Sequence, residues 1–188
     1  MSAEPTSKPK TVEDLLALEA ETYKRYEIVD GEFVETCVSD KSSETGQAFG
    51  AFLFMFVRQH RLGRVYDADM LFDLPQSTRK ADVSVVLGDR VPQVEVSHFV
   101  GAPDIVVEVI SPSDRWKDIR AKVQEWLDSG ATIVWLASPD SGEVFVFRRG
   151  RPLRTLTEND VLDGEDVLPG FTVPVSELFP SRQESRAS

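Results

Sequence analysis

The chain is poor in cysteine and has no long apolar run, and these two shortages exclude several classes of protein. Its single cysteine, Cys37, can form neither an internal disulfide nor a cysteine metal cluster. A lone thiol of this kind is more often buried and inert than nucleophilic. No apolar stretch approaches the roughly 20 residues that span a bilayer, and the first residues contain no apolar signal region. We therefore expect a cytoplasmic protein without a membrane partner.

Basic residues are also scarce. The sequence has 21 Lys and Arg residues against 32 Asp and Glu residues, which gives a net charge of −11. Proteins that bind nucleic-acid phosphates usually carry a basic surface, so this balance weighs against strong, indiscriminate binding to nucleic acid. A local cluster, Arg58, His60, Arg61 and Arg64, is better explained as a solvated helix end favoured by the helix dipole. A metal-dependent nuclease remains compatible with the charge, because bound cations cancel acidic charge at a site.

The length of 188 residues suits one domain. We expect this domain to cover residues 11–179. The segments 1–10 and 180–188 are polar and rich in small residues, which predicts flexible tails. The sequence shows no internal repeat and no low-complexity tract.

The first third of the chain predicts helix, hairpin and helix. Thr11 and Asp14 resemble a capping pair at the start of a helix. Asp30-Gly31 is a strong hairpin turn between strands at 26–29 and 32–38. Apolar residues at helical spacing predict a second helix over 42–60.

The remainder predicts strands around one further helix. Ser111, Pro112 and Asp114 have the residue types of a helix start, and Gly130 ends that helix after about Ser129. Trp116, Ile119, Val123, Trp126 and Leu127 would form its apolar face. The expected strands are 65–74, 81–87, 105–110, 132–137, 143–148 (an edge strand), 153–156, 167–171 and 173–179, with turns at 75–78 and 139–142 and a loop at 88–102.

The order of these elements predicts an α/β (mixed α+β) fold. Strand 105–110, the helix and strand 132–137 form a crossover unit, which pairs the two strands in parallel. We expect a mixed sheet with a parallel centre and antiparallel flanks, surrounded by about three helices.

Glu108 is the most unusual residue, because it stands inside the apolar run Val106-Val107-Glu108-Val109-Ile110. Burying an unpaired carboxylate costs several kcal/mol. Glu108 therefore needs a partner, which is either a buried Arg or Lys or a metal ion. Asp82 opens a neighbouring strand. Asp104 precedes Glu108 by four residues, so both would face the same side of a regular strand, where two carboxylates repel unless a cation lies between them.

Lys122 lies at the border of the apolar face of the helix that follows, from where its long stem can reach the edge of the sheet. Taken alone, it is more simply an ordinary boundary lysine. Together with Asp82 and Glu108 it suits metal-assisted phosphodiester hydrolysis, in which carboxylates bind Mg²⁺ and a lysine orients the attacking water or stabilises the developing charge.

Several stretches together resemble the Uma family of endonucleases, a branch of the PD-(D/E)XK, restriction endonuclease-like superfamily. The matching stretches are Arg25 to Glu32, Ala81-Asp82-Val83, Pro103 to Asp114, Lys122 within its helix, Val161 to Gly164 and Leu168 to Phe171. No single tripeptide among them is specific, but their order and spacing are.

The resemblance implies a restriction endonuclease-like fold and a metal site. Asp82 and Glu108 would be both metal ligands and catalytic residues, with Mg²⁺ as the cofactor and Mn²⁺ as a substitute. Position 110 is Ile where the superfamily has lysine, and Lys122 would replace that lysine from the helix. Glu27 would be an accessory acidic residue, although a surface charge on the hairpin is the simpler explanation.

The resemblance also implies DNA as the substrate and a homodimer as the assembly. Family members often have a histidine early in the second helix, where this chain has Thr45. His60 and His98 fall in segments that we expect to be exposed, and we assign neither a catalytic role.

Three functions remain open. The first is a Mg²⁺-dependent endonuclease that hydrolyses DNA phosphodiester bonds. Another is the hydrolysis of a different phosphate ester, a substrate that nothing in the sequence separates from DNA. The alternative is a non-catalytic protein-interaction module on the same scaffold, in which the charged residues would form a structural cluster. An exposed apolar patch near Trp135 or along strand 143–148 would favour the alternative.

Overall fold

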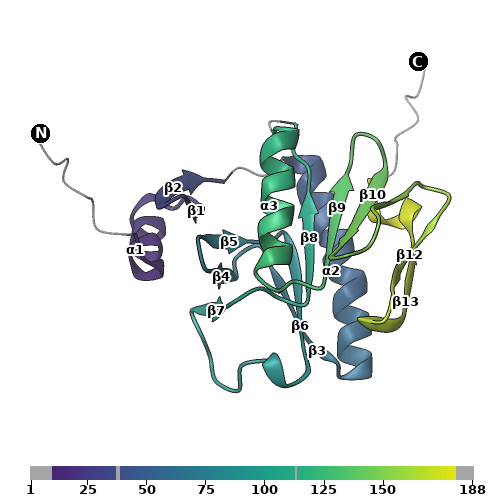
Figure 1. Cartoon of the computed structure of the whole chain (residues 1–188), viewed down its shortest axis with the longest axis horizontal. Coiled ribbons are helices and arrows are strands. Elements are labelled where there is room, and N and C mark those ends of the chain that lie inside the picture. The colour runs from purple at the N-terminus through teal and green to yellow at the C-terminus, as the bar shows by residue number, and fades with distance from the viewer. Residues whose placement is uncertain (1–9, 37–38, 113, 181–188) are drawn as a thin grey trace, which may run out of the picture.

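The computed structural model describes residues 10–36, 39–112 and 114–180 (Figure 1). Its α-helices are α1 (Val12–Thr22), α2 (Asp40–His60) and α3 (Trp116–Asp128), and its short 3-10 helices are η1 (Gly88–Arg90) and η2 (Val175–Leu178). Its strands are β1 (Tyr26–Val29), β2 (Glu32–Glu35), β3 (Gly63–Asp67), β4 (Leu71–Asp73), β5 (Thr78–Lys80), β6 (Val83–Leu87), β7 (His98–Val100), β8 (Ile105–Val109), β9 (Ile133–Ser138), β10 (Glu143–Arg148), β11 (Arg154–Leu156), β12 (Val161–Gly164) and β13 (Leu168–Pro174). The expected tails lie outside the described residues except for Lys10 and Pro180. Cys37 also lies outside them.

The main sheet has six strands in the order β11-β10-β9-β8-β6-β3. β8 and β9 are parallel, whereas the other neighbouring pairs are antiparallel, so the predicted mixed sheet with a parallel centre is confirmed. α2 and the hairpin β12–β13 pack on one face of this sheet, and α3 packs on the other (Figure 1). Strand alternation turns Ile105, Val107 and Val109 toward α2 and turns Val106 toward α3. Glu108 therefore also faces α3.

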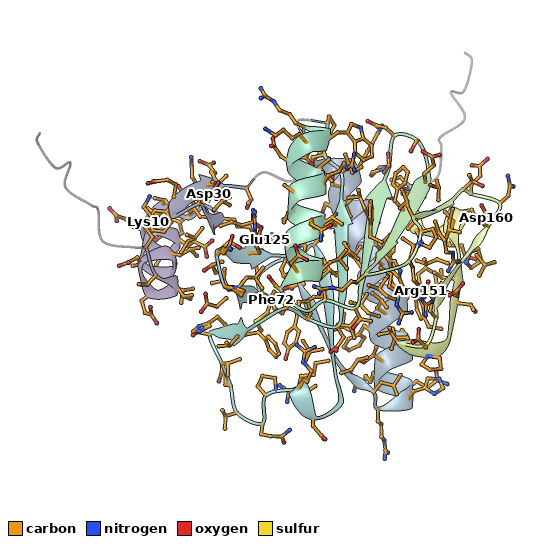
Figure 2. All side chains as sticks on the ribbon, in the orientation of Figure 1. Lys10, Asp30, Phe72, Glu125, Arg151 and Asp160 are labelled. Carbon is orange, nitrogen blue, oxygen red and sulfur yellow. The ribbon has the colours of Figure 1, made fainter. Side chains whose placement is uncertain are left out.

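A second sheet, in the order β2-β1-β5-β4-β7, lies on the α3 side. Phe72 of β4 is fully buried and contacts Trp126 of α3 edge to face, with ring centroids 5.7 Å apart. α1 packs on this sheet through Val12 and Leu15. Lys10 and Asp30 belong to this N-terminal region at one end of the molecule, and Arg151 and Asp160 lie at the other end (Figure 2). The second sheet brings β1 and β5 to the side of α3 where the site forms.

Two local predictions at the N-terminus are confirmed. The Thr11 hydroxyl accepts the Asp14 amide while the Asp14 carboxylate accepts the Thr11 amide, which forms a capping box for α1. Asp30 and Gly31 connect β1 and β2, and both have positive φ angles, 50° and 76°, as the tight turn requires.

Several strand predictions are wrong in their bounds. The segment expected as strand at 65–74 is two strands in different sheets, and the break lies at Asp69, whose amide donates to the Asp67 carboxylate in the turn. The turn expected at 75–78 runs into β5, and the loop expected at 88–102 contains β7. The segment expected as strand 173–179 is the end of β13 followed by η2, and β12 was not predicted.

The helix expected from Ser111 begins five residues later, at Trp116. The Ser111 amide donates to Asp114 over 2.7 Å and its hydroxyl pairs with Ser42 of α2 over 3.0 Å, so Ser111 closes a turn instead of capping the helix. Trp116 was expected on the buried face, but it is 54% exposed and contacts only the edge of Phe145. The buried stripe is Val123, Trp126 and Leu127, with Ile119 partly buried.

The strand over 143–148 is not an edge strand. β10 lies between β9 and β11, because β11 adds a further antiparallel strand. Trp135 is fully buried and stacks on Phe171 with ring centroids 5.8 Å apart. The two features that would have favoured an interaction module are therefore not exposed. No helix among the described residues has the length and apolarity needed to cross a membrane.

Candidate active site

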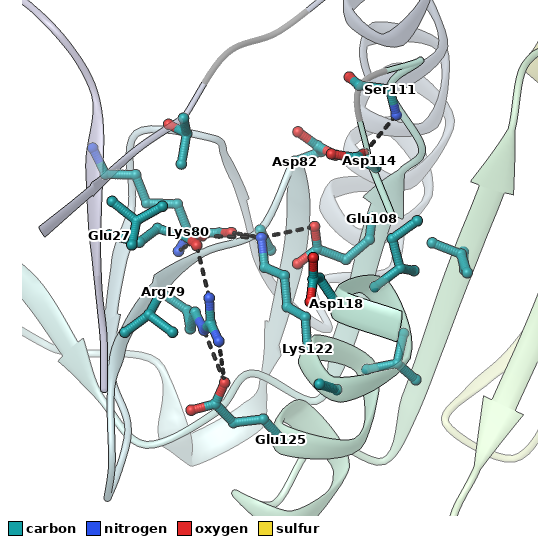
Figure 3. Close-up of a pocket in the computed structure, with 18 of the residues that line it drawn as sticks. Glu27, Arg79, Lys80, Asp82, Glu108, Ser111, Asp114, Asp118, Lys122 and Glu125 are labelled. Atoms are coloured by element: carbon teal, nitrogen blue, oxygen red, sulfur yellow. Dashed lines mark hydrogen bonds and ion pairs between the residues drawn. The ribbon is translucent and has the colours of Figure 1, made fainter. Parts of the chain in front are cut away.

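The pocket beside α3 gathers the residues that the sequence singled out. It has a volume of about 1080 Å³, and Glu27, Asp82, Glu108 and Lys122 all line it (Figure 3). They come from β1, from the residue before β6, from β8 and from α3. Segments nearly 100 residues apart in sequence therefore meet at one place.

Glu108 is 8% exposed and uses both carboxylate oxygens. One oxygen accepts the Trp126 indole N–H over 2.7 Å, and the other lies 3.0 Å from Lys122 Nζ. Burial raises the pKa of Glu108 to about 7, because desolvation and the nearby Asp82 outweigh the attraction of Lys122. The buried ion pair, one of the two partners that the sequence left open for Glu108, is present.

Lys122 Nζ is the centre of the cluster. It lies 2.9 Å from Glu27 and 3.0 Å from Glu108, and it donates to the Lys80 carbonyl over 3.1 Å. Burial opposes its charge, but Glu108, Glu27 and Asp82 together raise the pKa of Lys122 well above its usual value. The ammonium therefore stays protonated and acts as a fixed donor.

Asp82 stands immediately before β6 and reaches the end of β8, where its carboxylate accepts the Val109 amide over 2.7 Å. Burial raises the pKa of Asp82, and the nearby Glu27 and Asp114 raise it further, against the opposing effects of Lys122 and this hydrogen bond. Both central carboxyl groups are thus held where their charged forms are disfavoured.

Glu27 is a buried part of the cluster and not a surface charge of the hairpin, since it is 4% exposed. It accepts the Lys80 amide over 3.0 Å and Arg79 Nη1 over 3.0 Å, in addition to its contact with Lys122. Burial acts to raise the pKa of Glu27, but Lys122 and Arg79 outweigh it and hold that pKa below its usual value. The expected accessory residue is therefore present at the cluster.

Arg79 is a residue that the sequence did not reveal. Its guanidinium bridges Glu27 and Glu125, with Nη2 2.6 Å from the Glu125 carboxylate (Figure 3). It thereby connects β1 and β5 to α3. Its only sequence signal is its place three residues before Asp82, which does not distinguish a buried bridge from a surface arginine.

Asp104 is not brought to the pocket. Its carboxylate accepts the Leu87 amide over 2.8 Å and lies 2.7 Å from Arg90. It precedes the strand that carries Glu108, so the two residues are four apart and about 13 Å distant along β8. The even spacing does not place Asp104 beside Glu108. Two residues can point to the same face of a strand and still lie far apart along it.

Neither histidine lines the pocket. His60 is exposed, as expected, and packs against Phe56. His98 was also expected to be exposed, but it is half-buried. Its Nδ1 lies 3.1 Å from the Ser97 hydroxyl. Thr45, which stands where a histidine was noted for the family, is fully buried.

The donor set can be tested for a metal ion. Within residues 10–36, 39–112 and 114–180, no three Asp, Glu, His or Cys side chains are grouped as metal ligands. Mg²⁺ keeps several water ligands and needs only one or two protein carboxylates. Asp82 and Glu108 provide two, and the charge of Asp82 disfavours that of Glu108. Their chemistry therefore fits a hard divalent cation.

A solved structure has the same fold. The crystal structure of a "putative nuclease belonging to DUF820" from Anabaena variabilis superposes with a TM-score of 0.80, covering 91% of this chain and 98% of that one at 21% sequence identity. The chain therefore shares the fold of that structure, and the predicted mixed α/β fold with three α-helices is confirmed.

The sequence profile of one family covers nearly the whole described domain. It matches residues 12–176 and bears the description "Putative restriction endonuclease". The chain belongs to this family, Uma2, which confirms the resemblance seen in the sequence. No curated protein matches the chain significantly.

Proposed function

We propose that the protein is a Mg²⁺-dependent endonuclease that hydrolyses DNA phosphodiester bonds, with Mn²⁺ as a substitute cofactor. The observation that carries the proposal is the contact of 3.0 Å between Lys122 Nζ and Glu108 in a pocket that Asp82 also lines. Two carboxylates beside one protonated amine are the groups that metal-assisted hydrolysis requires. Membership of the Uma2 family supports the same activity.

Asp82 and Glu108 would hold the cation from the ends of two adjacent strands. Bound there, Mg²⁺ would polarise a phosphate oxygen and lower the pKa of a water molecule. Glu108 must be ionised to serve as a ligand, and its pKa of about 7 means that proton release accompanies binding near neutral pH. The Trp126 indole fixes one of its oxygens, which limits the orientations of the carboxylate.

Lys122 would donate a hydrogen bond to the attacking water or to a phosphate oxygen as negative charge develops. Because its pKa is raised, it is a poor base at neutral pH, and a donor role follows. Glu27 holds the Lys122 ammonium, and Arg79 holds Glu27. Both would position Lys122.

Cleavage of plasmid DNA tests the catalytic assignment. We expect Asp82→Asn and Glu108→Gln to abolish Mg²⁺-dependent cleavage, and Lys122→Met to slow it by about a hundredfold or more because one charge-stabilising donor is lost. Asp104→Asn is the matched control, since it removes a carboxylate outside the pocket and should retain activity. Cleavage that survives in both Asp82→Asn and Glu108→Gln would contradict the assignment.

Melting temperature tests the cation site without requiring activity. A ligand that binds only the folded protein stabilises it, by about 1.4 kcal/mol at ten times its dissociation constant. Mg²⁺ or Mn²⁺ should therefore raise the melting temperature of the wild type and of Asp104→Asn, but not that of Glu108→Gln. An equal rise in all three proteins would place the bound ion elsewhere.

We also propose that the protein acts as a homodimer, as the resemblance to dimeric superfamily nucleases implies. Two copies would present two sites, one for each strand of a duplex.

A further inference from the structure

Two thirds of the Lys and Arg residues in the described segments form ion pairs. Among the Lys and Arg residues of the described segments, only two groups form no ion pair with another described residue. The first group is Arg58, Arg61 and Arg64, and the second is Arg115, Lys117 and Arg120. All of these side chains are exposed. In a chain with an excess of acidic residues, two groups of unpaired cations need an explanation.

Local structure explains the first group but not the second. Arg58 and Arg61 lie at the C-terminal end of α2, where the helix dipole favours positive charge. Arg115 and Lys117 lie at the start of α3, where the same dipole disfavours it. Arg115 and Lys117 therefore meet an unfavourable dipole, which Asp118 in the same turn offsets only in part, and a bound anion would offset the remainder.

An exposed aromatic residue lies within the second group. Trp116 is 54% exposed, and its ring contacts Phe145 only edge to face. At about 100° per residue, Trp116, Lys117 and Arg120 fall within an arc of roughly 100° on α3. Cations interleaved with an exposed ring are the combination that binds a nucleic-acid strand, through its phosphates and through stacking on a base.

The second group also adjoins the candidate active site. Arg115 lines the same pocket as Asp82, Glu108 and Lys122. Arg115 is the member of the second group that lines the pocket, whereas Arg120 and Lys122 lie about 200° apart on α3, so the group continues from the rim of the pocket around the first turns of the helix. A strand that leaves the pocket past Arg115 would next meet the first turn of α3.

We propose that Arg115, Trp116, Lys117 and Arg120 form a docking surface for single-stranded DNA that leads into the pocket. The three cations contact backbone phosphates, and Trp116 stacks on an unpaired base. This inference rests on the proposed function and specifies its substrate as a single-stranded or locally opened segment. A fully paired duplex would offer its phosphates to this surface, but no base face to Trp116.

A chelator removes divalent cations, so that binding of DNA can be measured without cleavage. The probe is a fluorescein-labelled single strand of mixed sequence, about twelve nucleotides long. We expect the wild type to bind it by anisotropy, and Trp116→Ala to bind about tenfold more weakly. The combined variant Arg115→Gln/Lys117→Gln/Arg120→Gln should lose at least as much affinity, and the slope of log affinity against log salt should fall by about 2.

Two matched controls distinguish this surface from general effects. The variant Arg58→Gln/Arg61→Gln/Arg64→Gln changes the net charge equally and should retain most of the affinity. Tyr23→Ala removes a side chain that is 94% exposed and should have no effect. Equal weakening by both triple variants would overturn the proposal.

Tryptophan fluorescence identifies the stacked residue. Trp126 and Trp135 are fully buried, so an unlabelled strand that stacks on Trp116 should quench only the emission that Trp116→Phe removes. No binding by the wild type, or duplex binding of equal affinity without quenching, would overturn the proposal. Binding without Mg²⁺-dependent cleavage of either plasmid or the single strand would instead contradict the proposed function, and cleavage of the single strand that is unchanged in the Arg115/Lys117/Arg120 variant would overturn only this inference.

Discussion

At the scale of single residues, Glu108 and Lys122 share one cluster but have different balances of charge. Lys122 faces three carboxylates, so attraction exceeds the cost of burying it. Glu108 shares its single cation with Glu27 and lies near Asp82, so burial dominates. When ionised, Glu27, Asp82, Glu108 and Glu125 face only the two cations Lys122 and Arg79 among the described residues, so the cluster is two positive charges short, and a divalent cation would supply them.

The raised pKa of Glu108 predicts a pH dependence of stability in the absence of divalent ions. Its pKa is about 7 in the folded protein and about 4.5 in the unfolded chain, so the folded state binds more protons between these values. The free energy of unfolding should therefore fall as pH rises from about 4.5 to 7, by up to about 3 kcal/mol.

Urea denaturation of wild type and Glu108→Gln, each at pH 4.5 and pH 7.5 with a chelator, measures this effect. The variant cannot titrate at position 108, so the difference between the two proteins isolates the contribution of Glu108. If the free energies of unfolding of wild type and Glu108→Gln differ by the same amount at both pH values, the pKa of Glu108 is not raised.

At the scale of elements, an ionic bridge joins the second sheet to α3. Arg79 of β5 contacts Glu27 of β1 and Glu125 of α3, and its side chain is 12% exposed. Glu125 follows Lys122 by three residues on the helix, so the bridge also fixes the helix that carries the central amine. The site is therefore assembled by contacts between elements and not within one of them.

Removing the bridge should destabilise the fold markedly. We expect Arg79→Met to lower the free energy of unfolding by about 3 kcal/mol, because two carboxylates lose a buried partner. Lys41→Met is the control, since it breaks an exposed pair with Asp140 and should cost less than about 1 kcal/mol. Urea denaturation at pH 7 measures both, and equal losses would show that the bridge is no stronger than a surface pair.

At the scale of the whole molecule, the protein carries a net charge of −11. Acidic residues pair with most of the described cations, so the surface provides little long-range attraction for DNA. Activity on DNA would then depend on local contacts beside the pocket and on the bound cation. Because few phosphates are neutralised, we expect cleavage to fall only moderately with added salt.

The proposed homodimer is tested by sedimentation equilibrium. A dimer should give twice the chain mass of 21.0 kDa, and the mass should fall toward that of one chain on dilution. A mass of one chain at all concentrations, for a sample that cleaves DNA, would contradict the dimer.

The sequence by itself determined the local structure and the identity of the central residues. Side-chain periodicity and turn chemistry depend on neighbours in the chain, so α1, the Asp30-Gly31 hairpin, most of α2 and the β8–α3–β9 crossover could be predicted. Glu108 was recognisable because a carboxylate in an apolar strand is costly, Asp82 and Lys122 followed from their places on neighbouring elements, and the family resemblance added Glu27.

Only the tertiary structure decided which of these residues meet. It placed Glu27 and Lys122 within 2.9 Å, revealed Arg79 as their support, and placed Asp104 elsewhere. It also exposed Trp116, although helical spacing predicted burial. Sequence spacing specifies the face of an element, whereas contacts between distant segments depend on how the elements pack against one another.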